Sequence, residues 1–409
     1  MINIIDKNKC CGCSACVQAC PKQCISFDED EQGFRYPLVD KEHCIDCGLC
    51  EKVCPCLNQN EPRKPLKVYA AINPNEEIRM QSSSGGVFTM LAETTIAEGG
   101  VVFGARFDEN WEVIHDYTET YEGLEAFRGS KYVQSRIGET YKQTREFLKA
   151  GRKVLFSGTS CQIIGLKKFL RKEYDNLKTV DVVCHGVPSP LVWREYLKEL
   201  QSRPQGAVGE NTVLLSLKEI PIITGISFRD KSTGWRKYGF VVRGKSALKA
   251  DQNSVLTSYN DVVLHETVDK NLYMQGFINN LIIRPSCFAC PAKQGRCHSD
   301  FSLADFWAFK VYTPHLNDDK GITLLYAHTE NALNAISRLN IRCTELDREQ
   351  ELNIAFSRSA KEKFPAHTFW NMYSQRSLQS IQEVCLKIRP SVIRSFYQRV
   401  ISFIRRKLS

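Results

Sequence analysis

The sequence predicts a protein of mixed α+β and α/β class, with a small cysteine-rich N-terminal module, a larger α/β body and a helical C-terminal tail. Three observations lead to this prediction. Eleven of the eighteen cysteines lie before residue 57. From residue 67 onward, strand-like and helix-like segments alternate, as in a parallel sheet covered by helices. Near the end of the chain, apolar residues recur at helical spacing after Pro390.

The chain is long enough to bury more than one core. With 409 residues and 43% hydrophobic content, two or three domains are expected. The first residues, MINIIDKNKC, contain no apolar run of signal-peptide length, and no run of 18 apolar residues predicts a membrane span. We therefore expect a cytoplasmic protein, in which a disulfide framework is disfavoured. The cysteines need another role.

The net charge of +9 is unevenly distributed. Residues 1–60 hold six Lys and Arg against nine Asp and Glu, whereas 384–409 hold seven basic residues and no acidic one. The long middle part carries only a modest basic excess. This pattern does not indicate a basic nucleic-acid-binding surface, so no nucleic-acid partner is expected.

The cysteines of the N-terminal module follow a duplicated pattern. The first copy reads Cys10-x2-Cys13-x2-Cys16-x3-Cys20-Pro21, and the second reads Cys44-x2-Cys47-x2-Cys50-x3-Cys54-Pro55. Zinc modules, the weaker alternative, use two paired Cys-x2-Cys knuckles. The observed run, closed by a cysteine and a proline, is that of bacterial ferredoxins with 4Fe–4S clusters. Residues 1–60 are therefore predicted to form a two-cluster 4Fe–4S ferredoxin domain.

In this run the fourth cysteine ligates the cluster of the other copy. One predicted ligand set is Cys10, Cys13, Cys16 and Cys54, and the other is Cys44, Cys47, Cys50 and Cys20. The remaining cysteines of the module, Cys11, Cys24 and Cys56, fall outside the pattern and are interpreted as non-ligands. The segment LNQNEPRKPL at 57–66 is rich in proline and charge, which is typical of a linker.

The body alternates between strands and helices. Strands are expected at 68–72, 101–108, 153–158, 179–188 and 321–329, and helices within 81–100, at 162–172, from Ser189–Pro190 onward and at 330–339. We divide this part into 67–150 and 151–345. Consecutive strand–helix units imply parallel strands with right-handed crossovers, and ligands of such sheets bind beyond the carboxyl ends of the strands.

Two features of the body suit ligands but have simpler explanations. The turn at 82–86 opens a predicted helix whose free N–H groups suit an anion, although a serine N-cap with permissive glycines looks the same. Cys161 and Cys184 follow neighbouring strands, and the segment RPSCFACPAKQGRCHSD adds Cys287 and Cys290. Four thiols suffice for a further cluster; the alternative is that Cys161 and Cys184 are small buried apolar side chains.

A series of motifs resembles the coenzyme F420 (deazaflavin) hydrogenase/dehydrogenase beta-subunit family, in its bacterial form with an N-terminal ferredoxin domain. The resemblance covers residues 1 to about 310. After the ferredoxin module, the motifs are SSSGGVFTMLA, GSKYVQS, FSGTSCQIIGLKKFL, VVCHGVPSPLVW, ISFRDKSTGW, RPSCFACP and SDFSLADFW. Their order is specific, although each motif alone is not.

This resemblance implies an iron–sulfur flavoprotein with FAD in the body and a third 4Fe–4S cluster beside it. The implied ligands of that cluster are Cys161, Cys184, Cys287 and Cys290, whereas Cys297 departs from the family pattern and is left out. Archaeal members exchange a hydride with a deazaflavin. Bacterial members often stand among genes for surface-polysaccharide synthesis. The resemblance therefore implies that the substrate is a deazaflavin or another organic metabolite.

Several residues are candidates to hold the flavin or to act on it. The candidates for cradling its pyrophosphate are Ser83, Ser84, Gly85, Gly86, Gly158 and Thr159. Lys131 is expected to place a positive charge near the reduced flavin, as a cofactor-binding and catalytic residue. His185 is a candidate proton donor or a hydrogen-bonding support. Asp305 is either a cofactor ligand or a turn residue.

Two functions fit these features. One is an FAD- and iron–sulfur-dependent oxidoreductase that moves electrons between a ferredoxin-like carrier and a small-molecule substrate. The other is an electron-transfer subunit that serves a partner enzyme and has no substrate of its own. The expected partner is accordingly a redox protein or a small molecule.

The tail, 346–409, ends in a basic segment with apolar residues at helical spacing. Its apolar positions are Ile393, Phe396, Tyr397, Val400 and Ile404, and its charges include Arg394, Arg399, Arg405, Arg406 and Lys407. A helix of this kind either lies on an anionic membrane surface or packs its apolar side on the body. The first alternative predicts peripheral contact with the inner face of the membrane through 390–409.

Overall fold

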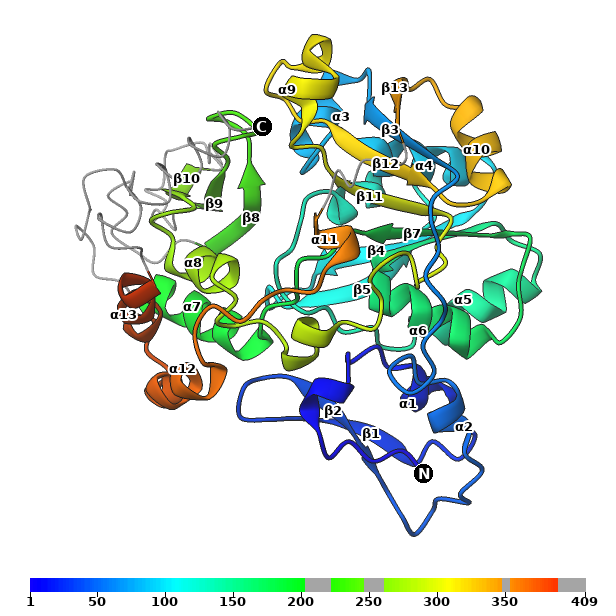
Figure 1. Cartoon of the computed structure of the whole chain (residues 1–409), viewed down its shortest axis with the longest axis vertical. Coiled ribbons are helices and arrows are strands. Elements are labelled where there is room, and N and C mark those ends of the chain that lie inside the picture. Colours follow the sequence, from blue (N-terminus) through cyan, green and yellow to red (C-terminus); the bar gives the residue numbers. More distant parts are fainter. Residues whose placement is uncertain (203–221, 246–260, 348–353, 389–409) are drawn as a thin grey trace, which may run out of the picture.

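The computed structural model describes residues 1–202, 222–245, 261–347 and 354–388. Figure 1 shows three regions: an N-terminal domain, an α/β body above it and a second lobe beside the body. A mixed α/β architecture with a ferredoxin-like N-terminal domain and C-terminal helices was predicted from the sequence, and the structure confirms it. The two alternatives for 390–409 concern residues outside the described ranges, so they stay predictions.

The N-terminal domain repeats one small motif. The elements are η1 (Lys7–Lys9), α1 (Ala15–Ala19), β1 (Ile25–Glu29), β2 (Arg35–Val39) and α2 (Leu49–Lys52). Each α-helix begins inside a cysteine run, after a residue in the left-handed conformation, Ser14 or Gly48. The two strands pair antiparallel, with Ile25 opposite Val39. Both cysteine runs therefore end on a short helix of the same small domain.

The body is built on one sheet with the strand order β13-β3-β12-β11-β7-β6-β4-β5. Its strands are β3 (Lys67–Ile72), β4 (Val101–Phe107), β5 (Val113–Thr118), β6 (Val154–Thr159), β7 (Leu177–Val182), β11 (Phe301–Asp305), β12 (Thr323–Ala327) and β13 (Arg342–Leu346). The central strands β4, β6, β7 and β11 are parallel, and the outer pairings are antiparallel. Strands from 67–150 and from 151–345 lie in this one sheet.

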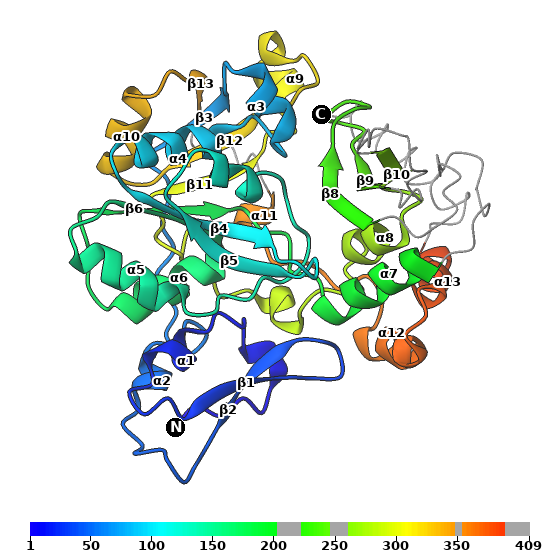
Figure 2. The same ribbon diagram turned by 180° about the vertical axis from the view of Figure 1, so that it is seen from behind.

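Helices cover both faces of the sheet (Figures 1 and 2). On one face, α4 (Val87–Ala97) and α10 (Glu330–Ser337) pack on side chains such as Val102 and Leu155. On the other, α5 (Thr140–Lys149) and α6 (Ser160–Leu170) pack on Val101 and Phe156. Because successive strand residues point to opposite faces, both sets can be buried. Two short helices, α3 (Glu76–Gln81) and α9 (Phe309–Tyr312), lie outside these layers.

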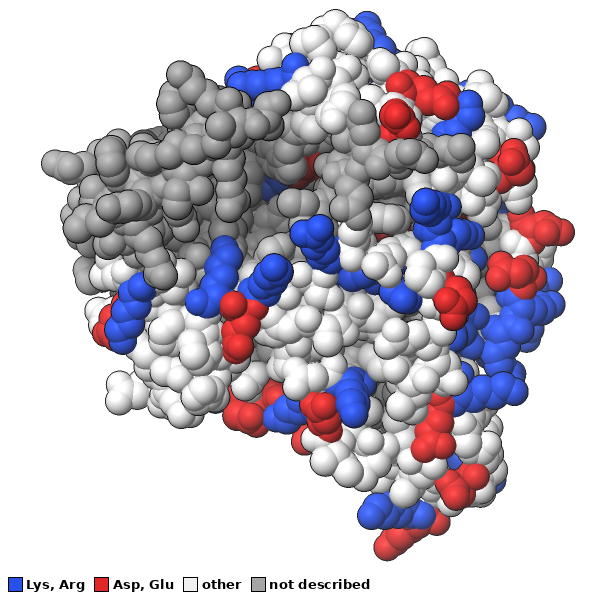
Figure 3. All heavy atoms as spheres, in the orientation of Figure 1, with Lys and Arg blue, Asp and Glu red and all other residues white. Residues whose placement is uncertain are grey.

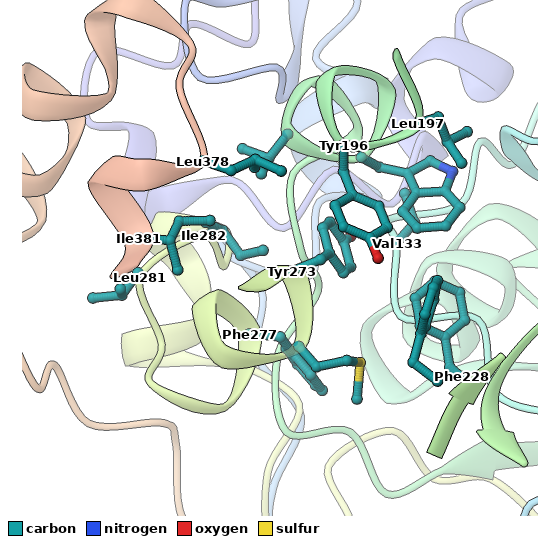
Figure 4. Close-up of a cluster of buried hydrophobic side chains, with 14 of the residues drawn as sticks. Val133, Tyr196, Leu197, Phe228, Tyr273, Phe277, Leu281, Ile282, Leu378 and Ile381 are labelled. Carbon is teal, nitrogen blue, oxygen red and sulfur yellow. The ribbon is translucent and has the colours of Figure 1, made fainter. Parts of the chain in front are cut away.

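The second lobe was not predicted from the sequence. Its sheet has the order β10-β9-β8, from β8 (Ile222–Asp230), β9 (Gly239–Lys245) and β10 (Asp261–Thr267). Its helices are α7 (Pro190–Ser202), α8 (Leu272–Ile278), α12 (Ala366–Met372) and α13 (Gln379–Ile388), whereas α11 (Ile354–Ser357) lies against the body. Figure 4 shows the core of this lobe, in which Tyr196 and Tyr273 lie together and Ile381 of α13 lies beside Ile282. The described helices after residue 365 thus belong to this lobe.

Two surface properties bear on partners. No helix within the described ranges is long and apolar enough to cross a membrane. Basic and acidic side chains are interspersed on the face shown in Figure 3, with several Lys and Arg side chains in a row across its middle.

Candidate functional site

Two cavities of the N-terminal domain are lined by cysteines from both runs. One cavity is lined by Cys10, Cys13 and Cys16 together with Cys54. The other is lined by Cys44, Cys47 and Cys50 together with Cys20. The structure thus brings together the two sets that the sequence pattern pairs crosswise. Their assignment as ligands stays a prediction.

These cysteines surround cavities and do not converge on a point. In the described part of the chain, no group of three or more His, Cys, Asp or Glu side chains is arranged to hold a metal ion. Cubane clusters differ from single ions because their four thiolates lie around the corners of a cube. Thiolates set around a cavity therefore fit the donor requirement of a 4Fe–4S cluster.

The three cysteines interpreted as non-ligands also lie at these cavities. Cys11 and Cys56 line the first, and Cys24 lines the second, with its Sγ 3.4 Å from that of Cys20. Hydrogen bonds with the side chains of Cys13, Cys161 and Cys56 raise the pKa of Cys11. Cys11 therefore lies at the contact between the N-terminal domain and the body. The cysteine spacing did not indicate this position.

The body brings Cys161, Cys184, Cys287 and Cys290 into one group. Every pair among these four thiols interacts electrostatically. Burial raises the pKa of Cys184 to about 12 and that of Cys290 to about 11, because a buried thiolate is poorly solvated. Hydrogen bonding from Cys11 lowers the pKa of Cys161 to about 7. Four such thiolates repel one another, and a cationic iron–sulfur core would relieve this repulsion.

Topology explains why these four residues meet. Cys161 follows β6 at the start of α6, and Cys184 lies just beyond β7, at the same edge of the sheet. Cys287 lies in η3 (Pro285–Ala289), with Cys290 directly after it. That segment is held at the edge by an isolated bridge between Pro188 and Ile283. Cys297 does not belong to this group, because its thiol contacts Ser299 and the buried Asp181.

The N-terminal domain docks beside this third cysteine group. Gly165 of α6 faces Cys13, and a Cβ at Gly165 would lie only 2.9 Å from the Cβ of Cys13. On α1, Gln18 Oε1 accepts hydrogen bonds from the backbone N–H groups of Tyr141, at 3.0 Å, and Lys142, at 3.2 Å. These contacts place the first cysteine cavity against the part of α6 that follows Cys161.

The serine- and glycine-rich turn lies beyond the carboxyl end of β3. Ser130 Oγ donates to Ser83 Oγ at 2.8 Å, and Lys231 Nζ donates to the carbonyl of Ser84 at 2.7 Å. Gly85 is required because a Cβ there would collide with the carbonyl oxygen of Ala71. Gly86 begins α4 with a φ of +81° and without a side-chain cap. An uncapped helix start of this kind suits a phosphate.

Lys131 lies next to this turn and faces the sheet edge. Its Nζ donates to the carbonyl of Arg128 at 3.0 Å and lies 5.9 Å from the ring centre of Phe107. Desolvation lowers the pKa of Lys131 to about 7. An anionic ligand at this edge would favour the charged amine.

Arg229 was missed as a site residue, although it lies in the motif ISFRDKSTGW. Its Nη1 lies 2.5 Å from Asp305 Oδ2 at the end of β11, and its guanidinium lies 4.1 Å from the ring centre of Tyr238. Asp305 therefore holds Arg229, an arrangement that the sequence did not suggest. Arg229 is 7% exposed, yet its Nε and Nη2 have no hydrogen-bond partner among the described residues.

The unpartnered donors of Arg229 bear on whether a flavin could bind at this edge. Buried N–H groups without acceptors are rare and costly, and the carbonyl or phosphate oxygens of a flavin nucleotide would satisfy them. Tyr132 connects Arg229 to the Lys131 loop, because Arg229 Nη1 lies 3.4 Å from the Tyr132 hydroxyl. Ser83, Lys131, Arg229 and Asp305 thus lie along one continuous polar edge. This edge fits FAD.

The remaining candidates already have partners. Thr159 caps α6 in a capping box with Gln162, and its hydroxyl lies 3.2 Å from Cys161 Sγ. Gly158 packs against Gln162 and His115. The Nε2 of His185 lies 2.5 Å from Asn280 Oδ1, which supports the hydrogen-bonding alternative for His185. Their predicted roles at the flavin remain predictions.

His115, which the sequence did not single out, is buried and neutral. Its Nε2 donates to the carbonyl of Ser157 at 3.1 Å, and its Nδ1 accepts from Ser135 Oγ at 2.9 Å. Burial lowers the pKa of His115 to about 4, compared with about 6.5 in an unfolded chain. The stability that the neutral ring contributes is therefore complete above about pH 6.5.

We expect that stability to fall as the pH decreases from about 6.5 to about 4, by up to about 3 kcal/mol, because only the unfolded chain takes up a proton on His115. The His115→Gln variant should lose less stability over this range. The measurement is the unfolding temperature of both proteins at pH 7 and pH 5. Equal decreases in the two proteins would contradict the assignment.

Comparison with known proteins identifies two regions of the chain. Residues 9–58 match the family described as "4Fe-4S dicluster domain", which confirms the prediction of an iron–sulfur N-terminal module. Residues 151–350 match the C-terminal part of the family described as "Coenzyme F420 hydrogenase/dehydrogenase, beta subunit". Over residues 151–350 the chain therefore belongs to the coenzyme F420 hydrogenase/dehydrogenase beta-subunit family, as the series of motifs predicted. This is a family of oxidoreductases.

Matches to individual proteins are distant. No curated protein matches the chain. Among solved structures, a chain of the F420-reducing nickel–iron hydrogenase complex from Methanosarcina barkeri is similar, with 13% sequence identity and a TM-score of 0.45. The match covers 79% of this chain and 92% of that one.

Proposed function

We propose that the chain is an iron–sulfur flavoprotein oxidoreductase that acts on a small-molecule substrate. It holds two 4Fe–4S clusters in the N-terminal domain, a third between Cys161, Cys184, Cys287 and Cys290, and FAD at the polar edge beyond. When bound, the clusters supply one-electron transfer and FAD supplies hydride exchange. The observation that carries the proposal is the third cysteine group, which adjoins the first N-terminal cavity and lies at the same carboxyl edge of the parallel strands as Asp305.

The residues of the polar edge have separate tasks in this proposal. The uncapped start of α4, with Ser83 and Gly86, binds the pyrophosphate. Arg229, oriented by Asp305, donates its free N–H groups to the flavin. Lys131 supplies a positive charge that stabilises a reduced, anionic flavin, and that anion in turn favours protonation of the lysine.

The substrate is a deazaflavin or another hydride-exchanging metabolite, including one used in surface-polysaccharide synthesis. A second candidate function follows from the matched family, whose description is that of a beta subunit. In that case the chain transfers electrons for a partner enzyme and has no substrate of its own. The cytoplasm is the proposed location in both cases, since reduced thiols are needed for cluster assembly.

Full-length protein prepared without oxygen tests the proposal. We expect about 12 iron atoms per chain, at four per cluster, and release of FAD on denaturation. Bound zinc without cubane absorbance, or failure to bind FAD, would contradict it. Turnover of coenzyme F420 or another hydride acceptor by the chain alone separates the enzyme from the electron-transfer subunit.

A further inference from the structure

Arg284 is the most deeply buried charged residue at the contact between the N-terminal domain and the body. Its exposed fraction is 0%. Nε donates to the carbonyl of Cys10 at 2.7 Å, Nη2 donates to the carbonyl of Arg35 at 3.0 Å, and Nη1 donates to Gln134 Oε1 at 3.0 Å. The guanidinium of this body residue thus binds two separate segments of the N-terminal domain.

The hydrogen-bond partners of Arg284 within the described ranges are all neutral. They are two backbone carbonyls and one side-chain amide. Its guanidinium also lies 4.3 Å from the ring centre of Tyr36 and 5.5 Å from that of Phe34. A buried charge is unfavourable unless an opposite charge compensates it. Carbonyls and aromatic rings orient the guanidinium, but they supply no full negative charge.

The groups that can supply this charge are thiols. Arg284 interacts electrostatically with Cys10, Tyr36 and Cys11 of the N-terminal domain and with Cys287 of the body. Burial raises the pKa of Tyr36 and so keeps its hydroxyl neutral. The positive charge of the same guanidinium also helps to lower the pKa of Cys161. It therefore lies between the first N-terminal cysteine set and the third set. The second N-terminal set lines a separate cavity, with no Arg284 among its lining residues.

We propose that Arg284 is a positioning residue whose buried charge is shared by the first N-terminal cluster and the third cluster, raising the reduction potential of both. The inference rests on the proposed function, because it requires clusters at both sets. Reduction adds one electron, and so one negative charge, to a cluster. A fixed positive charge beside the cluster stabilises the reduced form. Arg284 does not line the cavity of the second set, so the cluster of that set should not share this effect.

The test is a reductive titration of the anaerobic full-length protein, with dithionite as electron donor and electron paramagnetic resonance as the readout. In the Arg284→Met variant, the ratio of reduced to oxidised form at a fixed potential should fall about tenfold for two clusters, which corresponds to about 59 mV. The signal of the cluster in the second N-terminal set should not change. Arg284→Lys keeps the charge and should stay closer to the wild type.

A matched control is Arg194→Met. Arg194 also crosses the contact between the N-terminal domain and the body, where it pairs with Glu29 and with Glu112. Its side chain is 30% exposed, so solvent screens the change in charge, and its removal should leave all three potentials unchanged. Iron analysis accompanies each titration and shows whether a variant has retained its clusters.

A second variant covers the case in which Arg284→Met does not fold. Gln134→Glu keeps the arginine and places a carboxylate against Nη1, so it neutralises the charge in place. The same two potentials should fall. Unchanged potentials in an iron-replete variant, or an equal shift of all three, would overturn the inference. A wild-type protein without cubane signals would instead overturn the proposed function.

Discussion

Replacing Cys290 with alanine is expected to lower the iron content of the anaerobically prepared full-length protein from about 12 to about 8 atoms per chain, at four per cluster. Cys290 lies in one electrostatically coupled group with Cys161, Cys184 and Cys287. Three thiolates leave one corner of a cube without a ligand. Iron analysis and the cubane absorbance per chain measure the loss.

Two controls come from cysteines outside every predicted ligand set. Cys343 is exposed on β13, and Cys385 is buried in α13 against the core of the second lobe. Alanine at either position should leave the iron content unchanged. A Cys290→Ala protein that keeps all its iron would contradict the ligand assignment.

The second large effect is expected at Arg229. The Arg229→Gln variant should bind FAD at least tenfold more weakly, a loss of about 1.4 kcal/mol or more. The reason is that the unpartnered Nε and Nη2 are the donors proposed for the flavin. The variant should also be less stable by about 3–5 kcal/mol, because the carboxylate of Asp305 is left without its buried partner.

Combining Arg229→Gln with Asp305→Asn separates binding from stability. The double variant should recover much of the stability, since no unpaired carboxylate remains, but it should not recover FAD binding. Arg243→Gln is the matched control, because Arg243 pairs with Asp230 in the same sheet at 2.7 Å. FAD titration and thermal unfolding supply the two readouts. Wild-type FAD affinity in Arg229→Gln would exclude the proposed role.

Local patterns were sufficient for the N-terminal module and for most elements of the body. The cysteine run is a local signal, because one short loop presents three of the four thiols of each set. The strands expected at 68–72 and 153–158 agree with β3 and β6, and the helix expected at 162–172 agrees with α6. Continuous apolar runs bounded by glycine are typical of strands buried on both faces.

The second lobe escaped prediction because its core is assembled from distant segments. Tyr196 of α7, Phe228 of β8 and Ile381 of α13 pack together, although they lie far apart in the chain. None of these segments can bury its apolar side alone, and a periodic pattern within one segment does not identify its partner. The strand order within the body, which joins strands from 67–150 and 151–345 in one sheet, is likewise a non-local property.

By itself, the sequence determined that the N-terminal module is an iron–sulfur domain, that the body alternates strands and helices, and that certain cysteines and polar residues follow the strands. Only the tertiary structure decided which of these residues meet. Arg229 and Arg284 show the physical reason. The role of a buried charge depends on the groups that surround it. For Arg284 these include Cys10, and for Arg229 they include Asp305, both of which lie far away in the sequence.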